Sequence, residues 1–158
     1  MQEDFLHYVW LHKKFAHESL YTTQNQSILI KSVGQPNYNS GPDFFNAQIY
    51  IEDQLWVGTV EIHVQSSDWY VHHHEKDPAY DNVILHVVWT HTTEVFRADN
   101  SVVPTLVLES FVHSQLLKNY TALKKNKDQW IPCASQFSKV KGKSLEAHLH
   151  SRYFLFLT

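Results

Sequence analysis

The chain has 158 residues, of which 43% are hydrophobic and 14% aromatic, and its formal net charge is −3. This composition excludes a disordered chain, and the length fits one domain, with or without part of another. No overall positive field attracts nucleic acid or anionic lipid, and no apolar run approaches the roughly 20 residues that span a bilayer.

Cysteine and histidine are used very unequally. The single cysteine, Cys133, excludes an internal disulfide. The acidic start of the chain does not resemble a secretory signal, so we expect a cytoplasmic protein. Histidine occurs 12 times, with six copies between His63 and His91. Such clusters serve as metal ligands, general bases, pH sensors or solvated surface.

Hydrophobic periodicity and turn-forming residues predict a series of short elements. The predicted elements, in chain order, are a helix over 2–17, strands over 20–23 and 27–33, a loop over 34–42, a hairpin of strands 43–51 and 55–65, a short helix over 69–75, a strand buried on both faces over 83–89, strands near 93–97 and 102–109, and a helix over 112–127.

These elements predict an α+β domain with a central, mainly antiparallel or mixed β-sheet and flanking helices. We expect this domain to occupy residues 1–132 and to carry the site. Residues 133–158 then form a lysine-rich linker and the truncated start of a C-terminal helical region.

Three polar side chains interrupt the apolar hairpin: Asp43, Glu61 and His63. If the turn centres on Asp53, residues whose numbers sum to 106 lie opposite each other, so Asp43 faces His63 and shares a face with Glu61. Two carboxylates and an imidazole can hold Mg²⁺ or Mn²⁺, and such a cation polarises a phosphate and generates hydroxide. The alternative is a charge-assisted pair on a solvated rim.

The other histidines have less specific interpretations. Consecutive residues of a helix point about 100° apart, so we interpret His72, His73 and His74 as surface residues. His86 lies in an apolar strand and is interpreted as a hydrogen-bonded core histidine. If its strand lies beside the second hairpin strand, His86 instead supports Glu61 from outside a metal site.

Two residues that follow the hairpin, Ser67 and Asp68, are candidates for a supporting role. Their side chains could cap the short helix that begins there. Alternatively, a hydroxyl and exposed amides at a helix start could contact a phosphate. We favour capping.

Three blocks, 41–47, 60–69 and 77–88, closely resemble an uncharacterised bacterial family. The family is catalogued as domain of unknown function 2851 and occurs chiefly in the Bacteroidetes. The resemblance extends from Phe5 to Cys133, and because family members are considerably longer, the chain is similar to an N-terminal portion. Residues 151–158 depart from the amphipathic helix expected there. This resemblance implies no activity, since none is assigned to the family.

A second resemblance does imply an activity. The order Pro42-Asp43, a hairpin, Glu61-x-His63, a helix and a buried strand is similar to the PD-(D/E)xK nuclease superfamily, with histidine at the lysine position. It implies a restriction-endonuclease-like fold, a cation on Asp43 and Glu61, and His63 beside the attacking water. Glu3 on the first helix would assist, and nucleic acid would be the substrate.

Two hypotheses follow for the function. The first is a metal-dependent nuclease or phosphodiesterase that uses Asp43, Glu61 and His63. The second is a non-enzymatic binding or assembly module, in which Glu61, His63 and His86 form a structural polar network. The sequence does not indicate the oligomeric state.

Overall fold

The computed structural model describes residues 2–125. The chain divides into two compact units, residues 1–114 and 115–158. In the second unit the described element is helix α3, Ser114–Lys125. The boundary expected after residue 132, the linker over 133–158 and Cys133 lie outside the described residues.

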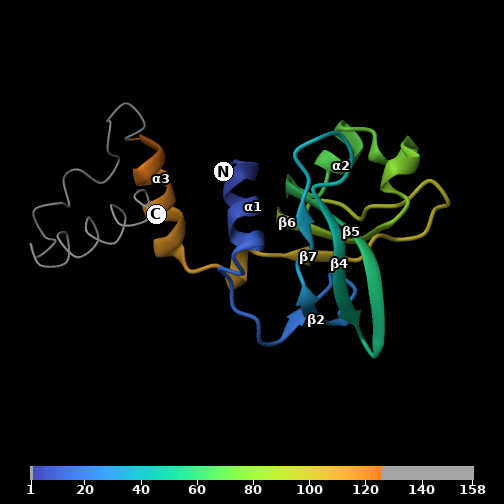
Figure 1. Ribbon diagram of the computed structural model, residues 1–158, viewed down its shortest axis with the longest axis horizontal. Helices are drawn as coiled ribbons and strands as arrows, with labels where there is room; N and C mark the ends of the chain where they lie inside the picture. Colours follow the sequence, from blue (N-terminus) through green and yellow to red (C-terminus); the bar gives the residue numbers. More distant parts are fainter. Residues whose placement is uncertain (1, 126–158) are drawn as a thin grey trace, which may run out of the picture. The chain divides into compact units, whose positions relative to one another are not determined.

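The first unit is built on one mixed sheet, with strand order β1-β2-β4-β5-β6-β7 and β3 paired to β4 (Figure 1). The strands are β1 Leu20–Tyr21, β2 Ser27–Ser32, β3 Gln35–Pro36, β4 Phe44–Ile51, β5 Gln54–Gln65, β6 Val83–Thr90 and β7 Thr105–Val107. Neighbours are antiparallel as far as β5, whereas β5 and β6, and β6 and β7, are parallel. The predicted α+β class with a mixed sheet is confirmed.

The first and last strands of the sheet, β1 and β7, are joined by a short stretch of pairing. Thr22, directly after β1, forms an antiparallel bridge with Leu106 of β7. The Thr23 N–H also donates to the Thr105 carbonyl at 2.9 Å. The sheet therefore curves far enough to join its first and last strands at this point.

Helix α1, Glu3–Leu11, lies beside the sheet (Figure 1). It packs against β5 with a fully buried apolar face. This face consists of Phe5, Leu6, Val9 and Trp10. Helical spacing of these residues explains why the helix forms, because burying them removes a wide apolar stripe from water. The helix is shorter than the predicted 2–17, and Lys13, with a left-handed φ of 48°, directs the chain away from the helix axis.

Residues between β5 and β6 form three short helical segments: α2 Asp68–Val71, η1 His74–Lys76 and η2 Pro78–Tyr80. They bury a second apolar cluster, which consists of Trp69, Tyr80, Val83, Val95 and Val103. The predicted strands near 93–97 and 102–109 are reduced to one bridge, Phe96 with Val102, and to β7. A last short helix, η3 Glu109–Phe111, ends the unit.

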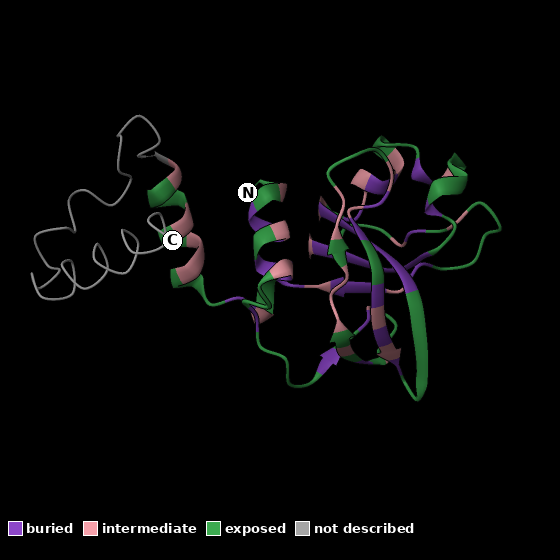
Figure 2. Cartoon of the chain, in the orientation of Figure 1, coloured by how far each residue is buried: buried purple, intermediate pink, exposed green. Residues whose placement is uncertain are grey.

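Strand β5 changes character along its length (Figure 2). Its first four residues are exposed and the next six, Gly58 to His63, are buried. The buried half carries Glu61 and His63, so the polar residues of the hairpin lie inside the fold. Among residues 2–125, no helix is long and apolar enough to cross a membrane.

Candidate functional site

The predicted hairpin register is wrong by one residue. Ile51 pairs with Gln54, so the turn has two residues and opposed residue numbers sum to 105, not 106. Glu52 takes the left-handed φ of 52° that tight hairpin turns demand. This slip alone would move Asp43 to the other face of the sheet.

A β-bulge in β4 reverses that effect. The register shifts beside Phe44, which pairs with Val60, and Asn46 there has a left-handed φ of 56°. Asp43 consequently lies opposite Glu61, whereas the prediction placed it opposite His63. The site residues still meet, although with different partners.

Asp43 and Glu61 are joined across the hairpin. The Asp43 N–H donates to Glu61 Oε2 at 3.1 Å, and the Ile62 N–H donates to Asp43 Oδ2 at 2.9 Å. Burial, followed by the negative charge of Asp43, raises the pKa of Glu61 to about 9. A bound cation would oppose both effects and favour the ionised carboxylate.

His63 lies at the centre of the site and is 1% exposed. Its Nε2 is 3.5 Å from Glu61 Oε1 and 3.0 Å from His72 Nδ1, and its Nδ1 is 2.8 Å from His86 Nε2. Burial, helped by the neighbouring imidazoles, lowers the pKa of His63 to about 2. The ring is therefore neutral at ordinary pH, which is the form that binds metals.

A break in the helix brings His72 and His74 to the same place. Helix α2 ends at Val71, His73 is left-handed with φ 61° and ψ 30°, and a new turn starts at His74. The rings of His72 and His74 lie 5.0 and 5.2 Å from the ring of His63. The predicted helix over 69–75 is confirmed only in part, because it is broken at His72 and His73 between α2 and η1. The surface position predicted for His72 and His73 is confirmed, and that predicted for His74 is wrong, because His74 is buried.

We call His63, His72 and His74 the histidine cluster. One ring nitrogen of each lies within 4.8 Å of the other two. Glu61 Oε1 adds an oxygen 3.2 Å from His74 Nε2. Although these two atoms are close, His74 Nε2 is buried without a hydrogen bond. The cluster and Glu61 are the residues that could hold a metal ion.

His86 lies behind the cluster. Strand β6 pairs with β5 so that His86 is the partner of Glu61, as one sequence hypothesis required. Its side chain, however, contacts His63 and not the carboxyl. His86 is fully buried, and burial lowers its pKa to about 3. It can hold the His63 ring in one orientation.

Helix α1 brings two further residues to the edge of the site. His7 Nε2 lies 3.1 Å from Asp43 Oδ2. Burial opposes protonation of His7, but the Asp43 carboxylate outweighs it and the pKa is raised. Burial and the charge of Asp43 also raise the pKa of Glu3. Sequence reasoning named Glu3 and missed His7, although their spacing of four residues on one helix could have indicated both.

Ser67 and Asp68 fasten the segment that follows β5. The Asp68 carboxylate accepts the Gln65 N–H at 3.0 Å, and the Ser67 N–H donates to Thr92 Oγ1 at 3.1 Å. Ser67 occupies the position before α2, but its side chain makes no capping hydrogen bond. The two residues therefore hold the backbone in place.

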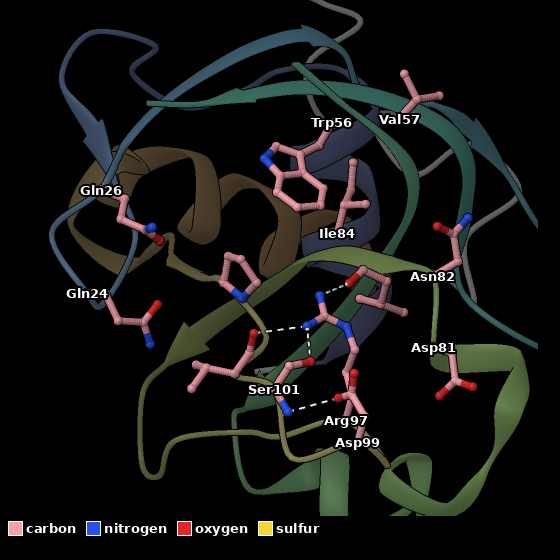
Figure 3. Close-up of a pocket in the computed structure, with 13 residues that line it drawn as sticks. Gln24, Gln26, Trp56, Val57, Asp81, Asn82, Ile84, Arg97, Asp99 and Ser101 are labelled. Carbon is pink, nitrogen blue, oxygen red and sulfur yellow. Dashed lines mark hydrogen bonds between the residues drawn. The ribbon is translucent and has the colours of Figure 1, made fainter. Parts of the chain in front are cut away.

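A cavity of about 750 Å³ contains none of these residues (Figure 3). It is lined by the β1–β2 turn, the starts of β5 and β6, and the loop before β7. Arg97 donates there to the carbonyls of Val83 and Val102 and to the Ser101 hydroxyl, so its guanidinium ties the loop to β6. The cavity is thus separate from the candidate site.

Comparison with known protein families identifies the family of this chain. A family described as "Protein of unknown function (DUF2851)" matches residues 3–157. The chain belongs to the DUF2851 family. This confirms the family resemblance seen in the sequence. No curated protein and no solved structure matches the chain in the same comparisons.

Proposed function

We propose that this DUF2851 protein is a metal-dependent phosphodiesterase that uses Asp43, Glu61 and His63. One observation carries the proposal: two carboxyls and a neutral imidazole converge at the buried end of one hairpin. Asp43 and Glu61 are hydrogen-bonded across the strands, and Glu61 Oε1 lies 3.5 Å from His63 Nε2. A divalent cation held there would lower the pKa of a bound water and polarise a phosphate.

His7 supports the proposal from the solvent side. It is 40% exposed and its raised pKa favours a cationic ring beside Asp43. A protonated imidazole at the rim can pair with a phosphate and give a proton to the departing oxygen. His63, buried and neutral, cannot supply that charge, so we assign proton donation to His7.

The proposed substrate class rests on the order of the site residues and secondary-structure elements along the chain. Asp43, the hairpin, Glu61-x-His63, α2 and β6 follow one another as the nuclease resemblance implies. Nucleic acid is therefore the substrate that we propose. With a net charge of −3 the chain must bind it through local contacts, not through an overall field.

A cleavage assay with the full 158-residue chain tests this function. DNA, RNA and a chromogenic phosphodiester are incubated with Mg²⁺, Mn²⁺ or Zn²⁺ in turn. Asp43→Asn and Glu61→Gln should each reduce metal-dependent cleavage by about 100-fold or more, which is the range for loss of acid–base or metal-binding groups. Asp53→Asn changes an exposed carboxylate in the hairpin turn and should leave the rate unaltered. Equal rates for all variants would overturn the proposal.

A structural polar network is the second candidate. It is favoured by the hydrogen bonds that satisfy both carboxylates without any cation. Thermal or urea unfolding with and without cation separates the two candidates. A ligand present at 100 times its dissociation constant adds about 2.7 kcal/mol to the free energy of unfolding. If no divalent cation at millimolar concentration stabilises the protein, the network is the better description.

A further inference from the structure

We infer that the histidine cluster and Glu61 bind a late first-row transition metal such as Zn²⁺, in preference to Mg²⁺. This inference rests on the proposed phosphodiesterase and revises its ligand set: Asp43 supports the site through the Ile62 N–H and His7 instead of binding the ion, and the hydrolytic water would be a fifth ligand. It stands on four side-chain atoms that converge from β5 and from the kink after α2: His63 Nε2, His72 Nδ1, His74 Nε2 and Glu61 Oε1.

The distances between these atoms suit a shared ion. At a zinc–nitrogen distance of about 2.0–2.1 Å, tetrahedral ligands lie roughly 3.3 Å from each other. The three separations that join the four atoms in series are 3.0, 3.5 and 3.2 Å. The three histidine nitrogens all lie within 4.8 Å of one another, so small side-chain rotations would bring the four atoms to the spacing of a coordination sphere.

The second observation is a buried nitrogen, His74 Nε2, that has no hydrogen bond. His74 is only 8% exposed, and its Nε2 makes no hydrogen bond even though Glu61 Oε1 is 3.2 Å away. Buried polar atoms normally have a hydrogen-bond partner, so each exception calls for a physical reason. A metal ion bound to both His74 Nε2 and Glu61 Oε1 would explain why these atoms lie close together without forming a hydrogen bond.

The donor types decide which metal fits. Mg²⁺ prefers six oxygen ligands in an octahedron and keeps several waters. Three imidazoles and one carboxylate instead suit Zn²⁺, Fe²⁺, Co²⁺ or Ni²⁺. Two carboxylates alone would suit Mg²⁺ or Mn²⁺, whereas the two added histidines favour metals that bind nitrogen.

His86 completes the arrangement as a positioning residue. With the metal on Nε2 of His63, the proton of that ring lies on Nδ1 and is donated to His86 Nε2, 2.8 Å away. Residues that bind the second nitrogen of a histidine ligand fix its tautomer and its orientation. The buried strand β6 therefore helps to hold the first ligand of β5.

Calorimetric titration of the chelator-treated full chain with Zn²⁺, and separately with Mg²⁺, tests the inference. We expect one Zn²⁺ per chain, and Mg²⁺ bound at least about 100-fold more weakly. His72→Ala and His74→Ala should each weaken Zn²⁺ binding by about 100-fold or more, since loss of a mere supporting residue costs 10–100-fold. Far-ultraviolet circular dichroism of each variant checks folding, and the exposed His72 provides the test if His74→Ala does not fold.

The chain contains its own matched control. His73 lies between the two proposed ligands but is exposed, and asparagine tolerates its left-handed backbone. His73→Asn should bind Zn²⁺ as the unaltered chain does. If His73→Asn weakens binding as much as His72→Ala, or if Mg²⁺ binds as tightly as Zn²⁺, the inference is wrong. No nucleic acid enters this titration, so tight Zn²⁺ binding without cleavage would support the metal site and reject only the phosphodiesterase.

Discussion

Glu61 lies between two chemically different neighbourhoods. On one side its carboxylate accepts the Asp43 N–H, and on the other it faces His74 at 3.2 Å and His63 at 3.5 Å. Both histidines have lowered pKa values because they are buried, so neither supplies a positive charge to the carboxylate. A buried carboxyl without a cationic partner protonates. A metal ion would supply the missing charge.

This leads to a prediction for the metal-free protein. Glu61→Gln should change the free energy of unfolding at pH 7 by less than about 1 kcal/mol, because glutamine retains an acceptor for the Asp43 N–H and the native carboxyl is already protonated. Glu61→Ala should cost about 1–3 kcal/mol, since that N–H loses its acceptor. Urea unfolding in the presence of a chelator measures both. A strongly destabilised Glu61→Gln would show that the carboxylate is charged without a metal.

The residues of the hairpin could be found from the sequence, whereas those of the α2 segment could not. Asp43, Glu61 and His63 stand out because each interrupts an apolar strand. His72 and His74 belong to a run that looks like a solvated helix face, and only the backbone of His73 reveals their role. His7 lies four residues after Glu3 on α1, so its place beside Glu3 could have been predicted, whereas its contact with Asp43 depends on how α1 packs.

At the scale of elements, the site depends on backbone conformations that L-amino acids rarely adopt. His73 breaks α2, and Asn46 marks the bulge that returns Asp43 to the face of Glu61. Gly34, with φ 89°, passes so close to β4 that an added Cβ would lie 2.5 Å from the Phe45 carbonyl oxygen. A glycine is thus needed beside the bulge.

The break at His73 can be tested by substitution. Left-handed backbone costs an ordinary residue roughly 1–2 kcal/mol, costs glycine nothing through Cβ, and is worst for β-branched residues. Metal-free stability should therefore decrease in the order His73→Gly, unaltered protein, His73→Val, with about 1–2 kcal/mol between the two variants. Urea unfolding gives the order. Equal stability of the glycine and valine variants would mean that the segment is helical through residue 73.

Prediction of the elements succeeded better than prediction of their pairing. Hydrophobic alternation located the helix at the start and the strands β2, β4, β5 and β6, because burial of apolar side chains determines where they form. The two-residue strand β3, Gln35–Pro36, was missed, because it lies in a segment predicted as a loop over 34–42. The register of β4 on β5 depends on a two-residue turn and one bulge, and these were set by single backbone angles at Glu52 and Asn46. Such angles leave no periodic trace in the sequence.

For the whole molecule, the buried ionisable groups predict how stability depends on pH. Burial lowers the pKa of His63 to about 2, of His86 to about 3, and also that of His74. Unfolded histidines titrate near 6.5. Below pH 6.5 the unfolded chain therefore binds up to three protons that the folded chain does not, and stability falls by up to roughly 1.4 kcal/mol per pH unit for each histidine.

Glu61 acts in the opposite direction, from pH 4.5 to about 9. Its folded pKa of about 9 exceeds its ordinary value of 4.5, so the folded protein holds one extra proton and loses stability as pH rises toward 9. The metal-free protein should therefore be most stable near pH 6.5. Urea unfolding from pH 5 to 9 with a chelator present gives the profile. Stability that rises steadily as the pH falls from 6.5 to 5 would contradict the burial of these histidines.

The central claim is that Glu61 and the histidine cluster hold one transition-metal ion inside the fold. Anomalous X-ray diffraction at the zinc edge, from crystals of the full chain grown with Zn²⁺, tests it most directly. We predict one strong peak about 2.0–2.1 Å from ring nitrogens of His63, His72 and His74, with Glu61 as the fourth protein ligand. Fully occupied zinc on other residues, with no peak at the cluster, would contradict the claim.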